Sequence, residues 1–215
     1  MSNELFKRIF SSIILLPVTF FIIIKGSYLF NFFILICFFL TAHEWHIMSK
    51  KKPFYISGFI FLVFSFYSIY HLRNDFGGDY IYFLIITLIC ISTDIGGYTF
   101  GKIIKGPKLT KISPKKTYSG MIGGYLLSIV FLSIFFNSSY FFANKLDLSL
   151  KWLIFIFAVS TISQLGDIVI SYFKRLTNIK DTGKIIPGHG GLLDRIDGMI
   201  FAYPFSYIIL VLNFF

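Results

Sequence analysis

Seven long apolar runs, separated by short polar connections, constrain this chain more than any other feature of its sequence. Each run has 15–22 residues, and together they cover residues 10–24, 28–44, 54–70, 80–98, 121–136, 152–173 and 199–215. A helix needs about 20 apolar residues to cross a bilayer. Because lipid offers the backbone no hydrogen-bond partners, such runs are predicted to be helices. We therefore expect an all-α, polytopic membrane bundle of about seven transmembrane helices that forms one domain over residues 1–215.

The composition disfavours a soluble fold. Hydrophobic residues make up 56% of the chain and charged residues 14%, whereas a soluble domain has about 25% charged residues. Helices that are hydrophobic all round are not expected at a water-exposed surface. Cys37 and Cys90 both lie inside apolar runs, so we interpret them as small buried residues rather than as a disulfide or a metal site.

The basic residues are distributed unevenly between the two sides of the predicted bundle. Of the 20 Lys and Arg residues, 16 lie in the N-terminal segment and in the connections 45–53, 101–120 and 174–198, which seven spans would place on one side. Cytoplasmic connections carry such an excess. This pattern predicts a plasma (inner) membrane protein with its N-terminus and both large basic loops in the cytoplasm. It also accounts for most of the net charge of +10 without a nucleic-acid partner.

Polar residues are densest in the region 166–198, which runs from the sixth span through a loop to the start of the last span. Asp167 precedes Lys174 by seven residues, about 10 Å along a helix. A carboxylate at this depth costs roughly 2.5–3.5 kcal/mol unless it has a partner or a water-filled cavity. Gln164, Ser171 and Lys174 share its helix face. We expect this face to line a polar cavity; a structural salt bridge between helices is the alternative.

Three further carboxylates need a physical reason. Asp94 interrupts the fourth span, and Asp194 and Asp197 stand three residues apart at the start of the last span, on one side of a turn. Mg²⁺ is typically bound by one or two carboxylates together with substrate phosphates. We therefore predict that Asp194, Asp197 and Asp167 are candidate ligands of Mg²⁺. Asp94 lies close to glycines that allow the backbone to approach a ligand. Helix capping by Asp194 and Asp197, and helix packing at Asp94, are the alternatives.

Two loops are predicted to bind phosphates. Backbone N–H groups in the glycine-containing loop 187–191 are suited to phosphate oxygens, and His189 is suited to donate to a phosphate or a leaving group. Two adjacent lysines beside hydroxyls in the segment 113–117, SPKKT, suit a polyphosphate, with attraction to lipid headgroups as the alternative. The predicted substrate-binding residues are Ser113, Lys115, Lys116, Thr117, Ser171, Gly188, Gly190 and Gly191. Residues 43–46, HEWH, are interpreted as an interfacial belt.

The sequence from Ser171 to Asp197 reads S-x-F-K-R-x4-K-D-x-G-x2-I-P-x-H-G-G-L-x-D-R-I-D. It resembles the signature of phosphatidate cytidylyltransferases (CDP-diacylglycerol synthases), and every position of that 27-residue pattern is filled. SPKKT at 113–117 and DxGxYxxG at 94–101 are similar to further motifs of this family. The resemblance implies transfer of CMP from CTP to phosphatidate, with Mg²⁺, to give CDP-diacylglycerol and pyrophosphate. It also implies a homodimer whose polar cavity opens to the cytoplasm. By match to the family motifs, Asp167 and Asp194 are the first choices for metal ligands, and Asp197 and Asp94 are further candidates, for Mg²⁺ with or without a second cation.

The residues expected to carry the reaction follow from this resemblance. The catalytic candidates are Asp167, Lys174, Arg175, Lys180, Asp181, His189, Asp194 and Arg195. The phosphate of phosphatidate is already anionic, so we expect catalysis by positioning and electrostatic stabilisation without a general base. A CTP-dependent polyprenol or lipid kinase, which would transfer the γ-phosphate, is an alternative. A transporter of anionic solutes is another, although the sequence lacks the inverted repeat that is usual in such proteins.

Overall fold

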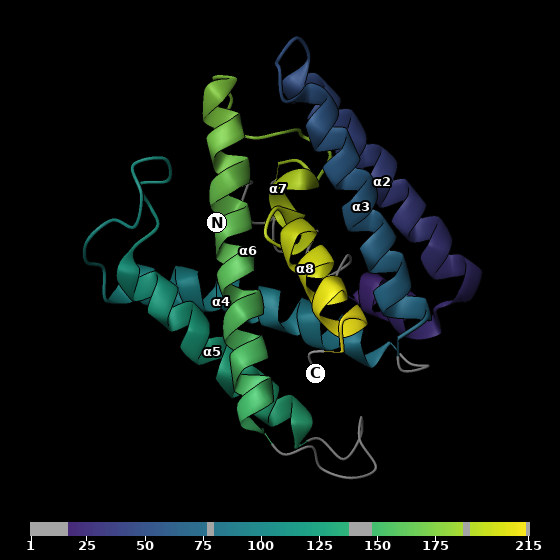
Figure 1. Ribbon diagram of the computed structural model, residues 1–215. Helices are drawn as coiled ribbons and strands as arrows, with labels where there is room; N and C mark the ends of the chain where they lie inside the picture. Colours follow the sequence, from purple (N-terminus) through teal and green to yellow (C-terminus); the bar gives the residue numbers. More distant parts are fainter. Residues whose placement is uncertain (1–16, 77–79, 138–147, 187–189, 214–215) are drawn as a thin grey trace.

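The computed structural model describes residues 17–76, 80–137, 148–186 and 190–213, which contain helices and no strand (Figure 1). The helices are α2 (Ser27–Ser49), α3 (Tyr55–Asn74), α4 (Ile81–Ile103), α5 (Tyr118–Phe136), α6 (Leu150–Leu176), α7 (Leu193–Ile196) and α8 (Met199–Val211). Residues 17–25 are helical as well. Five of these helices, α2 to α6, are long and apolar enough to cross a membrane. The prediction of a multi-pass helical membrane protein is therefore confirmed.

The first and last apolar runs differ from the other five. Residues 10–16 of the first run lie outside the described residues, whereas residues 17–24 are helical. The last run forms α8, which has 13 residues. Pro204 lies inside α8 and cannot donate to the carbonyl of Ile200, four residues earlier. The hydroxyl of Ser65 on α3 donates to that carbonyl at 2.8 Å, so the polar group that proline leaves without its helical partner is satisfied.

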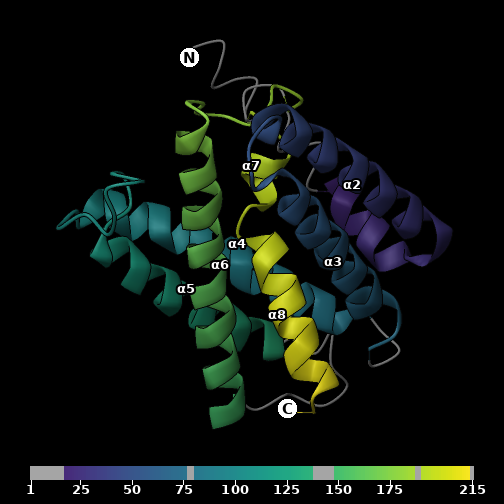
Figure 2. The ribbon, with the colours of Figure 1, turned by 45° about the horizontal axis from the view of Figure 1, so that its top comes forward.

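The helices pack in an arrangement that brings segments distant in the sequence side by side. In Figures 1 and 2, α8 lies between α3 and α6, and α4 runs beside α5. Glycines permit this close pairing of α4 with α5: a Cβ on Gly96 would overlap backbone atoms of Gly123 and Gly124. Close packing of this kind is common where small residues meet in membrane helices.

The interpretation of residues 43–46 as an interfacial belt is wrong for Glu44 and Trp45. Helix α2 continues through them to Ser49, and the two side chains are only 1% and 3% exposed. Trp45 Nε1 donates to Tyr55 O at 3.0 Å, and Glu44 receives hydrogen bonds from a distant loop. Both side chains are therefore satisfied by protein groups instead of by the membrane–water interface.

Candidate active site

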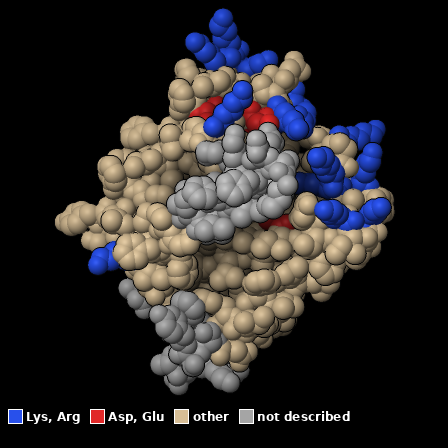
Figure 3. All heavy atoms as spheres, turned by 180° about the vertical axis from the view of Figure 1, so that it is seen from behind, with Lys and Arg blue, Asp and Glu red and all other residues tan. Residues whose placement is uncertain are grey.

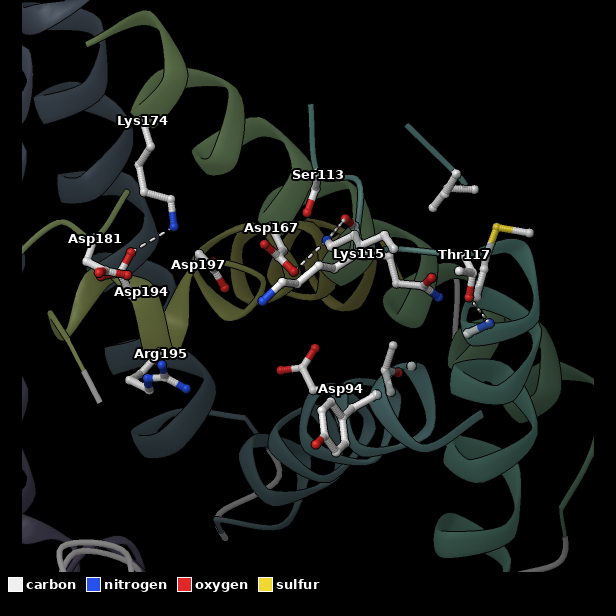
Figure 4. Close-up of a pocket in the computed structure, with 18 residues that line it drawn as sticks. Asp94, Ser113, Lys115, Thr117, Asp167, Lys174, Asp181, Asp194, Arg195 and Asp197 are labelled. Carbon is white, nitrogen blue, oxygen red and sulfur yellow. Dashed lines mark hydrogen bonds and ion pairs between the residues drawn. The ribbon is translucent and has the colours of Figure 1, made fainter. Parts of the chain in front are cut away.

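A polar cavity of about 440 Å³ lies where α4, α5 and α6 meet two loops (Figure 4). The charged residues that line it are Asp94, Lys115, Lys116, Asp167, Lys174, Asp181, Asp194, Arg195 and Asp197. Ser113, Thr117 and Gln164 add polar groups to its wall. The cavity thus joins the SPKKT segment to the region 166–198, although about 50 residues separate them in the sequence.

Three carboxylates point into one space in this cavity. They come from Asp94 on α4, Asp167 on α6, and Asp197, which directly follows α7 (Figure 4). Burial and the negative charges of Asp167 and Asp94 raise the pKa of Asp197 well above its ordinary value, against the opposing effect of Lys174. A bound cation would relieve this repulsion, so the three carboxylates suit Mg²⁺. The described part of the chain contains no already assembled group of three or more metal-binding side chains.

Asp167 on α6 also connects the 166–198 region to the SPKKT segment. Its Oδ2 accepts from Lys116 Nζ at 2.5 Å, and its Oδ1 accepts from Ser171 Oγ at 3.3 Å. Both charged side chains stay partly exposed, at 30% for Asp167 and 23% for Lys116. The pair is therefore accessible from the cavity, and a phosphate or a cation entering it would compete for these two charges.

Asp194 is held differently from the other three carboxylates. Its Oδ1 accepts from Lys174 Nζ at 2.8 Å, and its Oδ2 accepts from the backbone amides of Thr182 at 2.8 Å and Gly191 at 3.2 Å. Burial acts to raise the pKa of Asp194, but Lys174 and the two amides outweigh it, and the pKa lies below its ordinary value. Asp194 would therefore bind a metal only by exchanging Lys174 for the ion. Its predicted role as a ligand stays a prediction.

The lysine-bearing loop is built so that it presents its charges to the cavity. Residues Lys108 and Thr117 pair as an isolated bridge, and Leu109 N donates to Lys116 O at 2.8 Å. Thr117 also caps α5, because its hydroxyl accepts from Gly120 N at 3.1 Å. The loop is thus closed at its base, where Lys116 lies and pairs with Asp167 of α6. Both Lys115 and Lys116 line the cavity.

Several predicted site residues do not line the cavity. These are Ser171, Arg175, Lys180, Gly190 and Gly191. Arg175 is exposed and donates to Ile179 O at 3.0 Å, which closes the C-terminal turn of α6. Gly191 gives its amide to Asp194, so it shapes the loop and does not face the cavity. Gly188 and His189 lie outside the described residues.

Sequence reasoning missed one residue of this region, Glu44. It is a buried carboxylate whose partners are Thr182, Leu192 and Leu193. The signal that identified Asp94 and Asp167, a carboxylate within or at the end of an apolar run, was present at Glu44 too. The adjacent histidines and tryptophan made an interfacial position the simpler interpretation.

Comparisons with known proteins show which family the chain resembles. Residues 53–213 match the model of the cytidylyltransferase family. Phosphatidate cytidylyltransferase of Rickettsia bellii is 35% identical to this chain in an alignment that covers 96% of the chain and 91% of the relative. The proteins of the same name from Rickettsia felis and Bacillus subtilis are 34% and 37% identical, and cover 98% and 71% of the chain and 94% and 56% of their own lengths.

Proposed function

The chain belongs to the cytidylyltransferase family, and from this premise we propose that it transfers CMP from CTP to phosphatidate, giving CDP-diacylglycerol and pyrophosphate. One observation carries the proposal. A single cavity brings the SPKKT segment together with Asp167, Lys174 and Arg195 of the 166–198 region. A site for two phosphate-bearing substrates needs cations from more than one direction, and this cavity provides them.

The reaction joins two anions, so charge is its main obstacle. An oxygen of the phosphatidate phosphate attacks the α-phosphorus of CTP, the new P–O bond forms, and the bond to the bridging oxygen breaks as pyrophosphate leaves. The attacking oxygen is already ionised, so no side chain has to remove a proton. Lys115, Lys116 and Lys174 would hold phosphate oxygens, and Arg195 would offer two parallel donors. Fixing both substrates this way supplies positioning and electrostatic stabilisation.

Mg²⁺ fits the carboxylates of this cavity. Asp94, Asp167 and Asp197 would hold the ion, and Asp194 would join them if Lys174 turned to a phosphate. When bound, Mg²⁺ neutralises charge on phosphate oxygens. In the structure, two lysines of the cavity pair with carboxylates, Lys116 with Asp167 and Lys174 with Asp194. Arriving phosphates would take over these cations, and the released carboxylates would then face the ion.

The placement in the membrane follows from the distribution of charge. On the face drawn in Figure 3, Lys and Arg gather toward one end, with acidic residues among them, whereas the described residues at the opposite end of this face include few of either. We place that basic end on the cytoplasmic side of a bacterial plasma membrane, so that the cavity opens to the cytoplasm. The proposed protein has seven spans that form one catalytic domain. The acyl chains of phosphatidate then stay in lipid. A homodimer is part of the same proposal.

A product assay tests this function. Purified protein in detergent–lipid micelles receives phosphatidate, Mg²⁺ and CTP labelled at the α-phosphate. We expect label in the lipid phase, one pyrophosphate released per labelled lipid, and loss of both with EDTA. Transfer of label only from γ-labelled CTP to a lipid alcohol would instead establish a kinase. No transfer from folded protein with either label would refute the proposal and favour a transporter.

A further inference from the structure

Glu44 lies on α2, far from the 166–198 region in the sequence, yet it contacts that region directly. Its side chain is 1% exposed. Its Oε2 accepts from Thr182 Oγ1 at 3.0 Å and from Leu193 N at 2.8 Å, and its Oε1 accepts from Leu192 N at 2.9 Å. Three donors on one buried carboxylate make an arrangement that is costly to disturb, because an unpaired buried charge is strongly unfavourable.

Two glycines let the carboxylate approach the loop this closely. A Cβ added to Gly183 would stand 2.6 Å from Glu44 Oε1, and one added to Gly191 would stand 2.6 Å from Glu44 Oε2. Any side chain at either position would therefore displace the carboxylate. Of the glycines predicted to bind phosphate, Gly191 makes room for Glu44 instead.

Glu44 and Asp194 hold the same short base of the loop 182–193. Thr182 gives its hydroxyl to Glu44 and its amide to Asp194. At the other end of the loop, Gly191 gives its amide to Asp194, and Leu192 gives its amide to Glu44. The two ends of the loop are thus bound to both carboxylates, one reaching in from α2 and the other lying beside the cavity.

We propose that Glu44 is a positioning residue that fixes the base of the loop 182–193 and so holds Asp181 and Asp194 at the cavity. Hydrogen bonds from backbone amides to a carboxylate are charge-assisted and directional. Asp181 directly precedes Thr182, and Asp194 directly follows Leu193, so both cavity residues are neighbours of groups that Glu44 binds. The functional consequence rests on the proposed CMP transfer, whereas the structural part can be measured without it.

The first test compares activity among matched variants. Glu44→Gln puts an NH₂ group against an amide donor, and Thr182→Val removes the hydroxyl without touching α2. We expect each to lower kcat about 10–100-fold, as a displacement of about 1 Å does, with a smaller change in the KM for CTP. Thr182→Ser keeps the hydroxyl and should restore near-normal kcat. The control is Thr41→Val, because Thr41 is equally buried one turn earlier on α2 and, within the described residues, its hydroxyl donates only to carbonyls of its own helix.

The second test measures the loop itself. Lys184 is exposed inside the loop, so trypsin cleavage after Lys184 reports how firmly the base is held. Glu44→Gln and Thr182→Val should be cut there several-fold faster than the wild type, and Thr41→Val and Thr182→Ser should not. Unchanged cleavage in Glu44→Gln, or normal kcat in both Glu44→Gln and Thr182→Val, would overturn the proposal. If the wild type transfers no CMP, the proposed function fails, while the cleavage rates still decide whether Glu44 holds the loop.

Discussion

Lys174→Met isolates the energetic value of the ion pair that anchors Asp194. The atoms Lys174 Nζ and Asp194 Oδ1 are 2.8 Å apart, and the two side chains are 10% and 6% exposed. At this distance the Coulomb energy is about 6 kcal/mol with an effective dielectric constant near 20. Removing one partner of a buried pair costs about 3–5 kcal/mol. The amides of Thr182 and Gly191 still stabilise Asp194 in the variant, so we expect a loss of about 3 kcal/mol.

The expected loss is large enough to measure as a thermal midpoint in detergent. For a chain of this size it corresponds to a decrease of about 6–12 °C in Tm. Lys151→Met is the matched control, because Lys151 is an exposed lysine near the start of the same helix, α6. Adding Asp194→Asn to Lys174→Met removes the unpaired charge and should recover part of the loss. If the thermal midpoint of Lys174→Met equalled that of the Lys151→Met control, or if the double variant recovered no stability, the ion pair would not anchor Asp194 as described.

Three further predictions test other parts of the structure. The folded-state pKa of Asp197 is raised, so ionisation of this carboxyl opposes folding as the pH rises above the ordinary pKa. Asp197→Asn should therefore raise Tm at neutral pH in EDTA while it lowers activity. An unchanged or lower Tm would show that Asp197 is not destabilised by the neighbouring carboxylates. The folded-state pKa of Asp194 is lowered, so its contribution to stability is present above the ordinary value of 3.8 and is lost as the pH falls through the lower folded pKa. Asp194→Asn should therefore weaken the decrease of Tm at acidic pH when Tm is measured over a series of pH values. A Cβ on Gly96 would overlap the backbone of Gly123, whereas one on Gly97 would have its nearest atom at 3.8 Å. Gly96→Ala should therefore lower the free energy of unfolding by about 1–3 kcal/mol, and Gly97→Ala should lower it little. Equal thermal midpoints for the two variants would contradict the close packing of α4 on α5.

Much of the fold could be predicted because the bilayer leaves the backbone few choices. Long apolar runs must form helices, so five of the seven predicted spans appear as helices of membrane-spanning length. Helix ends were less predictable. Helix α2 runs five residues past the predicted end at residue 44, because Glu44 and Trp45 find their partners within the protein.

The candidate site was predictable where a polar group stood in an apolar run. Asp94 and Asp167 required a cavity or a partner, and both line the same cavity as the SPKKT segment. The hydrogen bonds of Glu44 were not predictable, because its partners are 138–149 residues away in the sequence. The sequence predicts Lys174 as a phosphate-binding residue, whereas in the structure Lys174 pairs with Asp194. This pairing likewise depends on how the loop folds back onto α6.

Whether CMP transfer takes place in this cavity can be tested by changing one carboxylate inside the cavity and one outside it. Incorporation of label from α-labelled CTP into lipid would be compared for the wild type, Asp167→Asn and Asp75→Asn. Asp167 lies in the cavity wall, whereas Asp75 is an exposed carboxylate that pairs with His71 after α3. We predict that Asp75→Asn matches the wild type and that Asp167→Asn, although it inserts and folds normally, loses nearly all incorporation. Near-normal incorporation by Asp167→Asn would contradict the account, because the reaction would then take place elsewhere.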